Sequence, residues 1–446
     1  MNDIKIEEKI SKEVYEVSNK LEQNNFSSYL VGGSIRDILM NNQVSDYDLA
    51  TNAVPEDLKK IFPNAILFGE KFGTIMLVIS NKRIEITTLR SESEYNDNRH
   101  PAKVSFIDDI NEDLKRRDFT INALAFDLIN SKLIDIFGGK EDLQHKIIRA
   151  VGDPDERFKE DALRLLRAVR FSLKLDFVVE ENTYNSIKKN SSLIEYISKE
   201  RIRDELMKII LEENSSKGIE ILRDTELLKY IIPELLVCVG VEQNKFHSLD
   251  VYDHLLLSMD KADKRVKLVA LLHDIGKPQT KDGEHFFGHE RVGSDIARRI
   301  LTRLHFPKND INLISKLIEL HLFHYEENWS DSAVRRFLRK VEDDNTLELL
   351  FLLREADENG NPISSYDFDN LAQLKDRINK IKNQDRYLSL KDLNISGDDL
   401  IKLGYNRDKS LGDTLKFLLD VIIEDPSMNN KEKLLSLAKD KLNKLV

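Results

Sequence analysis

The sequence has little of several features that would restrict its class. Its 446 residues include a single cysteine, Cys238, which excludes an intramolecular disulfide and a zinc site built from cysteines, and fits a reducing cytoplasm. Apolar runs such as residues 349–353 are far shorter than the roughly 20 residues that span a bilayer, so we expect no membrane segment. The charged, helix-patterned first residues are not typical of a signal peptide. We therefore expect a cytoplasmic protein.

Glycine and proline are also scarce, with 17 and 9 residues. Together with 33% charged and 41% hydrophobic residues, this composition is typical of a helix-rich globular chain of about three domains. The 68 basic and 79 acidic residues give a net charge of −11. This charge argues against a protein held on nucleic acid by bulk charge, although it is compatible with a local basic groove.

Short β-rich segments gather before residue 150, mixed with helical ones, and they predict an α+β head with a small mixed sheet. Residues 1–25 have the apolar spacing of one amphipathic helix. After Gly152 nearly every segment has a 3.6-residue apolar period, which predicts an all-α remainder. Asp153 followed by Pro154 is a good helix start, because aspartate caps the first turn and proline fits its first position.

Gly32 and Gly33 follow an apolar strand and begin a helix that carries Arg36. Glycines at this place let backbone N–H groups approach a phosphate at the helix N-terminus. Taken alone, the pattern fits an ordinary strand–turn–helix equally well.

Asp46 and Asp48 follow in a strand-like segment, where alternation places both carboxylates on one face. Adjacent carboxylates repel and need a cation, and Mg²⁺ with oxygen ligands is the natural one. The alternative is an aspartate-rich turn. Glu85, in another predicted strand, is either a third carboxylate of this site or an exposed strand residue.

The helix that starts at Asp153 carries Asp161, Arg164, Arg167 and Arg170 at intervals of three, so all four can line one face. The neighbouring leucines indicate burial, and buried arginines need anionic partners such as triphosphate oxygens. The alternative is a surface ion pair on a solvated face. Asp161 with Arg164 also suits base reading, because cytosine and adenine both present an amino donor beside a ring-nitrogen acceptor, whereas guanine and uracil present the reverse.

Five segments in order carry a family resemblance: residues 30–40, 46–51, 116–123, 160–171 and 200–206. They resemble the motifs of the class II tRNA nucleotidyltransferases, the CCA-adding enzymes, within the superfamily typified by DNA polymerase β. The resemblance implies a nucleotidyltransferase that adds CCA to tRNA 3′ ends with CTP, ATP and Mg²⁺, with Asp161 and Arg164 selecting the base. It also implies that Arg116 and Arg117 contact the sugar and phosphates, the alternative being a basic turn. The polar loop 91–113 would assist the change from C to A addition.

Histidines and aspartates in the helical part form a second constellation. Their order resembles the HD phosphohydrolases, and imidazole and carboxylate groups suit a divalent transition metal (Mn, Ni, Fe or Zn). The implied activity is metal-assisted hydrolysis of phosphate esters; the alternative is a motif kept for structure alone. The candidate ligands are His254, His273, Asp274, His289, His321 and Asp357.

The two resemblances together predict four parts: a nucleotidyltransferase head at 1–151, a helical neck with the nucleotide-selecting helix at 152–240, an HD-type body at 241–365 and a tRNA-binding helical tail at 366–446. Two other functions stay open. One is an A-adding enzyme or a poly(A) polymerase, and the other is an HD phosphohydrolase whose head only binds RNA. The oligomeric state is not indicated by the sequence.

Overall fold

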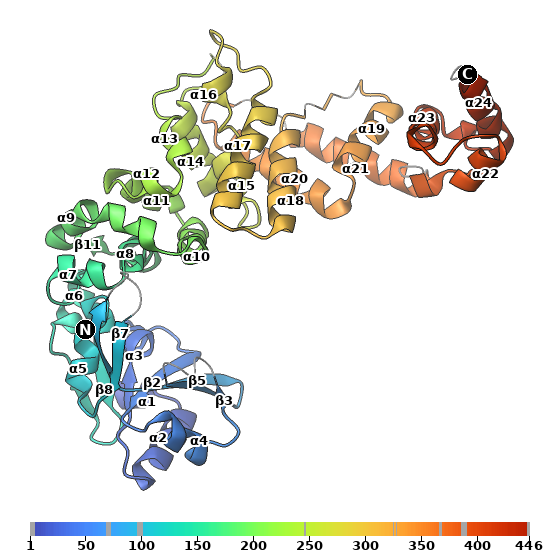
Figure 1. The fold of residues 1–446 in the computed structure, drawn as a ribbon. Helices are drawn as coiled ribbons and strands as arrows, with labels where there is room; N and C mark the ends of the chain where they lie inside the picture. The colour runs from blue at the N-terminus through green and yellow to red at the C-terminus, as the bar shows by residue number, and fades with distance from the viewer. Residues whose placement is uncertain are drawn as a thin grey trace. The chain divides into compact units, whose positions relative to one another are not determined.

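The computed structural model describes residues 5–67, 73–95, 101–244, 247–323, 325–326, 328–364, 368–384 and 390–443 (Figure 1). Two compact units are distinguished by their internal contacts. The first unit runs to Val237 and includes Ile300–Phe306, and the second unit contains Cys238–Arg299 and Pro307–Val446.

A mixed sheet forms the centre of the head in the first unit. Its strand order is β3-β4-β5-β2-β1-β8-β9, and β2 runs parallel to β5 while the other neighbours are antiparallel. The sheet and its alternating buried residues confirm the predicted α+β head. The strands are β1 (Tyr29–Val31), β2 (Asp46–Thr51), β3 (Ile66–Leu67), β4 (Thr74–Ile79), β5 (Lys82–Thr88), β8 (Ala125–Asp127) and β9 (Lys132–Ile134).

The single helix predicted over residues 1–25 is wrong, because the described part contains two helices. The chain leaves helical geometry at Ile10, whose extended backbone (φ −80°, ψ 134°) buries its side chain. Burial of this isoleucine overrides the helical spacing of the sequence. The helices of the head are α1 (Ile6–Lys9), α2 (Lys12–Gln23), α3 (Gly32–Leu39), α4 (Pro55–Ile61), α5 (Ile110–Lys115) and α6 (Gly139–His145), with a 3₁₀ turn η2 (Thr120–Asn122).

The predicted polar loop at 91–113 is also structured. It contains most of an antiparallel hairpin of β6 (Arg90–Tyr95) and β7 (Pro101–Phe106), followed by most of α5. Residues 96–100 lie outside the described residues. β7 does alternate apolar and polar residues (Ala102, Val104 and Phe106), but β6, with the sequence RSESEY, does not. The hairpin therefore depends on cross-strand pairing, which the pattern of β6 alone does not reveal.

The rest of the first unit is helical. Asp153 caps α7 (Pro154–Glu160) as predicted, because its side chain accepts hydrogen bonds from the N–H groups of Asp155 and Glu156. Two short parallel strands, β10 (Ile147–Ile148) and β11 (Val178–Val179), pair beside these helices. The other elements are α8 (Leu163–Leu175), α9 (Glu181–Lys189), η3 (Ser191–Tyr196), α10 (Lys199–Ile210), α11 (Ser215–Asp224), α12 (Leu228–Ile231) and α13 (Pro233–Leu236).

The prediction that Asp161 shares a helix with Arg164 is wrong. The helix breaks at Asp161, which has extended geometry (φ −145°, ψ 103°) and accepts a hydrogen bond from the N–H of Leu163 through Oδ1 (3.1 Å). Aspartate side chains compete in this way with the regular backbone bonds of a helix.

The second unit is built of helices, as the apolar period predicts. Within the described ranges, no helix is both long and apolar enough to cross a membrane. Near the C-terminus, buried side chains of α22, α23 and α24 form a core of their own. The helices are α14 (Val251–Lys261), α15 (Lys267–Leu272), α16 (Lys277–Thr280), α17 (His289–Arg303, whose end belongs to the first unit), α18 (Lys308–Leu320), α19 (Asp331–Val341), α20 (Asp344–Asn359), α21 (Phe368–Gln384), α22 (Gly397–Lys402), α23 (Lys409–Glu424) and α24 (Lys431–Asn443), with 3₁₀ turns η4 (Leu390–Asp392) and η5 (Pro426–Met428).

Candidate functional site

The glycine turn lies between an aspartate and an arginine. Gly32 has φ +64°, a conformation that favours glycine, and a Cβ there would lie 3.1 Å from Arg117 Nη1 and 3.6 Å from Asp48 Oδ2. The hydroxyl of Ser34 accepts a hydrogen bond from the N–H of Asp48 (2.8 Å) and donates one to the carbonyl of Asp46 (3.2 Å). These bonds fasten the start of α3 to β2, so that the glycine turn and the aspartates form one unit.

The carboxylates of β2 lie on one face of the strand, because Tyr47 between them is buried on the other. Glu85 of β5 pairs in register with Asp48, although its side chain is exposed. Burial, together with the negative charge of Glu85, raises the pKa of Asp48 to about 6. The charges of Arg117 and Arg36 lower this pKa only in part, and a divalent cation with oxygen ligands would stabilise such a cluster of carboxylates further.

A cavity of about 630 Å³ opens beside this turn in the first unit. Eight arginines and Lys174 line it against four aspartates, so the lining has an excess of positive charge that suits a polyanion. Asp46 and Glu85 are not among the lining residues. All the nucleotide-binding candidates from the sequence do line it, together with Asp48: Gly32, Gly33, Arg36, Arg116, Arg117, Asp161, Arg164, Arg167 and Arg170.

The arginines of α8 have carboxylate partners that the sequence did not reveal. Nε of Arg167 donates to Asp118 Oδ2 (2.8 Å), and Nη1 of Arg170 donates to Glu205 Oε1 of α10 (3.0 Å). Burial alone would raise the pKa of Asp118, but the charge of Arg167 and the hydrogen bonds that Asn122 and Arg167 donate lower it to about 2. The stripe is therefore held in place before any ligand binds.

Arg164 is fixed by three contacts from other elements. Its Nη1 donates to Glu160 Oε2 (2.5 Å) and to the carbonyl of Arg157 (2.9 Å), and its Nη2 donates to the carbonyl of Arg116 (2.8 Å). A guanidinium has five N–H donors, so these contacts orient the group while leaving donors for a ligand.

Arg116 and Arg117 share a single buried carboxylate, that of Asp113. Nη2 of Arg116 lies 2.7 Å from Oδ1, and Nη2 of Arg117 lies 3.0 Å from Oδ2. Burial opposes ionisation of Asp113, but the charges of Arg117 and Arg116 hold its pKa below the usual value. Both arginines line the cavity, so the shared carboxylate holds two guanidinium groups at its wall.

A shared helix face would suggest an ion pair between Asp161 and Arg164, but the two side chains do not pair. Asp161 Oδ2 instead accepts a hydrogen bond from Nη2 of Arg201 in α10 (2.8 Å). Both residues nevertheless line the same cavity as Arg164. Forty residues separate Arg201 from Asp161, and no local pattern in the sequence predicts their contact.

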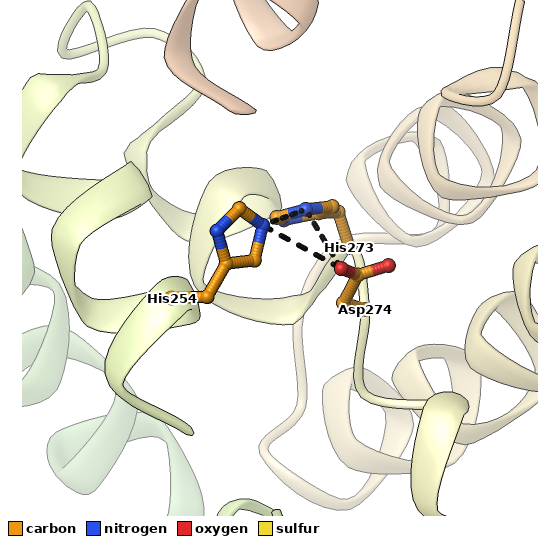
Figure 2. Close-up of side chains that lie close together, drawn as sticks. All are labelled: His254, His273 and Asp274. Carbon is orange, nitrogen blue, oxygen red and sulfur yellow. Dashed lines mark hydrogen bonds and ion pairs between the residues drawn. The ribbon is translucent and has the colours of Figure 1, made fainter. Parts of the chain in front are cut away.

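The histidine–aspartate set converges in the second unit. Figure 2 shows His254 of α14 beside His273 and Asp274, which follow α15; the two Nε2 atoms lie 3.2 Å apart. His254 Nε2 also lies 3.1 Å from Asp357 Oδ1, and Asp274 Oδ1 lies 3.0 Å from His289 Nε2 and 3.5 Å from His321 Nε2. All six predicted ligands therefore meet in one cluster around Asp274.

Each imidazole of this cluster turns its Nδ1 toward a backbone carbonyl and its Nε2 toward the centre. The carbonyl partners are Ala270 for His273, Phe286 for His289, Ile318 for His321 and Gly360 for His254, at 2.7–3.2 Å. A carbonyl that accepts from Nδ1 fixes the tautomer that leaves Nε2 free to bind a metal. In the described part of the chain, ligand atoms come within 4.8 Å of one another in two groups, His254 with His273 and Asp274, and Asp274 with His289 and His321.

The charges of the cluster also fit a cation. Burial would lower the pKa of His273, yet Asp274 and Asp357 raise it to about 10, which reveals an excess of negative charge. Lys277, which is not one of the predicted ligands, lies 2.5 Å from Asp274 Oδ2 and compensates part of this charge. Packing here is tight, because a Cβ on Gly276 would lie 2.3 Å from the carbonyl oxygen of His289 and 2.5 Å from the N atom of Gly293.

The fold and these two sites define a nucleotidyltransferase of the polymerase type that also carries an HD domain. Three known families match the chain: the poly A polymerase head domain at residues 28–149, the probable RNA- and SrmB-binding site of polymerase A at 176–238, and the HD domain at 246–358. Nucleotidyltransferases of this family depend on divalent metal ions.

The chain is 35% identical to the CCA-adding enzyme of Ligilactobacillus salivarius (strain UCC118) over 98% of both chains. It is 48% identical to that of Lactobacillus helveticus (strain DPC 4571), over 47% of this chain and 53% of the relative. The Bacillus stearothermophilus CCA-adding enzyme in complex with CTP superposes with a TM-score of 0.68 at 25% identity, covering 97% of this chain and 98% of that one. The chain therefore belongs to the CCA-adding enzyme family.

Proposed function

We propose that this protein adds CCA to tRNA 3′ ends without a template, with CTP, ATP and Mg²⁺ as the other reactants. The observation that carries the proposal is that Asp48, the glycine turn, Asp161 and Arg164 all line one positively charged cavity. Solved relatives with the same fold include CCA-adding enzymes with CTP, with ATP and with tRNA. Their ligands are the substrates that this reaction needs.

Asp46 and Asp48 would hold Mg²⁺, which when bound lowers the pKa of the primer 3′-hydroxyl and neutralises charge on the α-phosphate. The backbone of Gly32 and Gly33 leaves room for phosphate oxygens at the start of α3. Around this point Arg36, Arg116, Arg117, Arg167 and Arg170 orient the triphosphate and the sugar by charge-assisted hydrogen bonds.

Asp161 and Arg164 would select the base. The carboxylate of Asp161 accepts from the amino group of cytosine or adenine, and the guanidinium of Arg164 donates to the ring nitrogen. Guanine and uracil would oppose like-polarity groups at both positions, at a cost of about 1–3 kcal/mol per contact. The protein thus replaces a template strand by two side chains.

Incubation of the purified protein with Mg²⁺, tRNA lacking CCA and labelled CTP or ATP tests the proposal. Incorporation of both nucleotides in the order C, C, A is expected, and no incorporation would refute it. Use of ATP alone would instead identify an A-adding enzyme or a poly(A) polymerase, because only a CCA-adding enzyme incorporates C on this substrate.

Base selection has its own test. Asp161→Ala should relax discrimination against GTP and UTP more than it lowers total turnover with CTP. Unchanged discrimination would count against the reading role of Asp161.

We also propose a second activity, metal-dependent hydrolysis of phosphate esters, favoured by the convergence of all six HD ligands. A transition metal such as Mn, Ni, Fe or Zn would bind there and activate water for attack on phosphorus. Hydrolysis of 2′,3′-cyclic nucleotides that survives Asp46→Ala and disappears in Asp274→Ala would support it. Loss of hydrolysis in both variants, or in neither, would contradict a separate site.

The organisation that goes with this function has a head at 1–151, a neck at 152–240, an HD-type body at 241–365 and a tRNA-binding tail at 366–446. The matched families at 28–149, 176–238 and 246–358 support the first three parts. We propose a cytoplasmic location, where tRNA is the natural partner.

A further inference from the structure

Helix α10 contributes Arg201 to the cavity that Asp161 and Arg164 line. Nη2 of Arg201 lies 2.8 Å from Asp161 Oδ2, and both residues line the cavity. The two side chains are 29% and 21% exposed, so the pair is partly shielded from water. Partial burial makes this ion pair stronger than one on an open surface.

Asp161 needs such support because of its place in the chain. It lies at the break between α7 and α8, where its backbone is extended. Its carbonyl accepts a hydrogen bond from the N–H of Arg164 in α8 (3.0 Å), but this backbone bond does not orient the side-chain carboxylate. Its Oδ1 accepts from the N–H of Leu163, and its Oδ2 accepts from Arg201. Two donors on different oxygens fix the plane of the carboxylate, which a single donor would leave free to rotate.

The orientation of that plane matters for base reading. A carboxylate accepts hydrogen bonds best near the directions of its lone pairs, and these lie in its plane. Each oxygen has room for a second donor, so the contacts with Leu163 and Arg201 leave acceptor sites for an amino group of a base.

We propose that Arg201 is a positioning residue for nucleotide selection and that it acts through Asp161. The inference rests on the proposed base-reading role of Asp161. Removal of Arg201 lets the carboxylate turn, so the amino groups of cytosine and adenine lose their fixed partner and guanine and uracil are rejected less strictly. Turnover with CTP should fall less than selectivity, because the contact that Arg201 makes in the structure is with the base-reading carboxylate of Asp161.

The experiment compares Arg201→Gln with Arg203→Gln as a matched control on the same helix. Arg203→Gln also removes one charge, but Arg203 contacts Asp204, the backbone carbonyl of His305 and the ring of Phe306, and it does not line the cavity. The readouts on tRNA lacking CCA are the kcat/KM ratios of CTP to UTP and of ATP to GTP, with the melting temperature of each variant. Arg201→Gln is expected to lower both ratios about 10-fold, and Arg203→Gln to leave them unchanged.

Two further variants separate the possible failures. If Asp161→Ala leaves the ratios unchanged, the base-reading proposal itself fails. If Asp161→Ala lowers them and Arg201→Gln does not, only the role of Arg201 is overturned. The double variant, Arg201→Gln with Asp161→Ala, should show the same kcat/KM ratios as Asp161→Ala, because Arg201 acts through Asp161. A further loss of selectivity in the double variant would show that Arg201 does not act through Asp161.

Arg201→Lys guards against a folding defect. Lysine keeps the charge but lacks the planar fork that fixes a carboxylate, so selectivity should lie between the parent and Arg201→Gln. Should Arg201→Gln fail to fold, reduced selectivity of Arg201→Lys at an unchanged melting temperature supports the proposal, and full selectivity overturns it.

Discussion

The arginine-lined cavity of the first unit and the histidine cluster of the second hold their charged groups in opposite ways. In the cavity, Asp118, Glu205 and Asp113 hold arginines whose remaining N–H groups can meet a polyanion. In the cluster, Nε2 atoms and carboxylates converge on a common point, with backbone carbonyls behind them. A site for a negatively charged substrate needs arginines that keep N–H donors available for it. A site for a bound metal needs nitrogen and oxygen lone pairs that point to one position, and here the backbone carbonyls orient the imidazoles that provide them.

Asp48→Asn is expected to have the largest effect on the cavity and none on the histidine cluster. The change keeps the shape of the side chain but removes the charge that a cation beside the cavity needs, so nucleotide addition should fall about 1,000-fold. Incorporation of labelled CTP measures the loss. The metal content of the histidine cluster, measured by elemental analysis, should stay as in the parent, and loss of that metal would show that the two sites are not independent.

The reciprocal variant is Asp274→Asn. Asp274 faces both groups of ligands, so its loss should weaken metal binding by more than about 100-fold and abolish phosphoester hydrolysis. Elemental analysis after dialysis against a chelator checks the first effect. CTP incorporation serves as the control, and a variant that retains its metal would argue against this cluster as a metal site.

Glu205→Gln tests how much the carboxylate partners of the cavity arginines contribute to the stability of the fold. Arg170 and Glu205 form a largely buried ion pair, and removal of one partner leaves an uncompensated charge. We expect the free energy of unfolding to fall by about 3 kcal/mol in urea titrations. Glu56 is exposed, so Glu56→Gln should change the free energy of unfolding little. Equal effects of the two variants would show that the ion pair of Arg170 and Glu205 does not stabilise the fold.

The smallest expected effect concerns acid stability. The pKa of Asp118 is lowered to about 2 in the fold, so its ionised form stabilises the protein above the unfolded pKa of about 4 and this contribution disappears as pH falls toward 2. It amounts to about 2 kcal/mol. Urea titrations from pH 6 to pH 2 should show the stability gap between the parent and Asp118→Asn narrowing below pH 4, and a constant gap would contradict the assignment.

Local patterns in the sequence predicted the features that depend on neighbouring residues. The alternation around Tyr47 placed Asp46 and Asp48 on one face, and Asp153 with Pro154 marked the start of α7. The order of the histidines and aspartates predicted a cluster, and these side chains do converge in the second unit.

Features that depend on distant residues could not be predicted in this way. Glu205 contacts Arg170 across 35 positions and Arg201 contacts Asp161 across 40, and both partners look like ordinary charged helix residues. The break at Asp161 was missed because its spacing from Arg164 fits a continuous helix. Only the competition of its side chain for the N–H of Leu163 decides otherwise.

The close approach at Gly276 has a practical consequence for engineering this protein. An added methyl group there would collide with the first turn of α17 and push His289 out of register with its neighbours. If codon 276 were randomised and the resulting library screened for bound metal, the surviving clones should encode glycine alone.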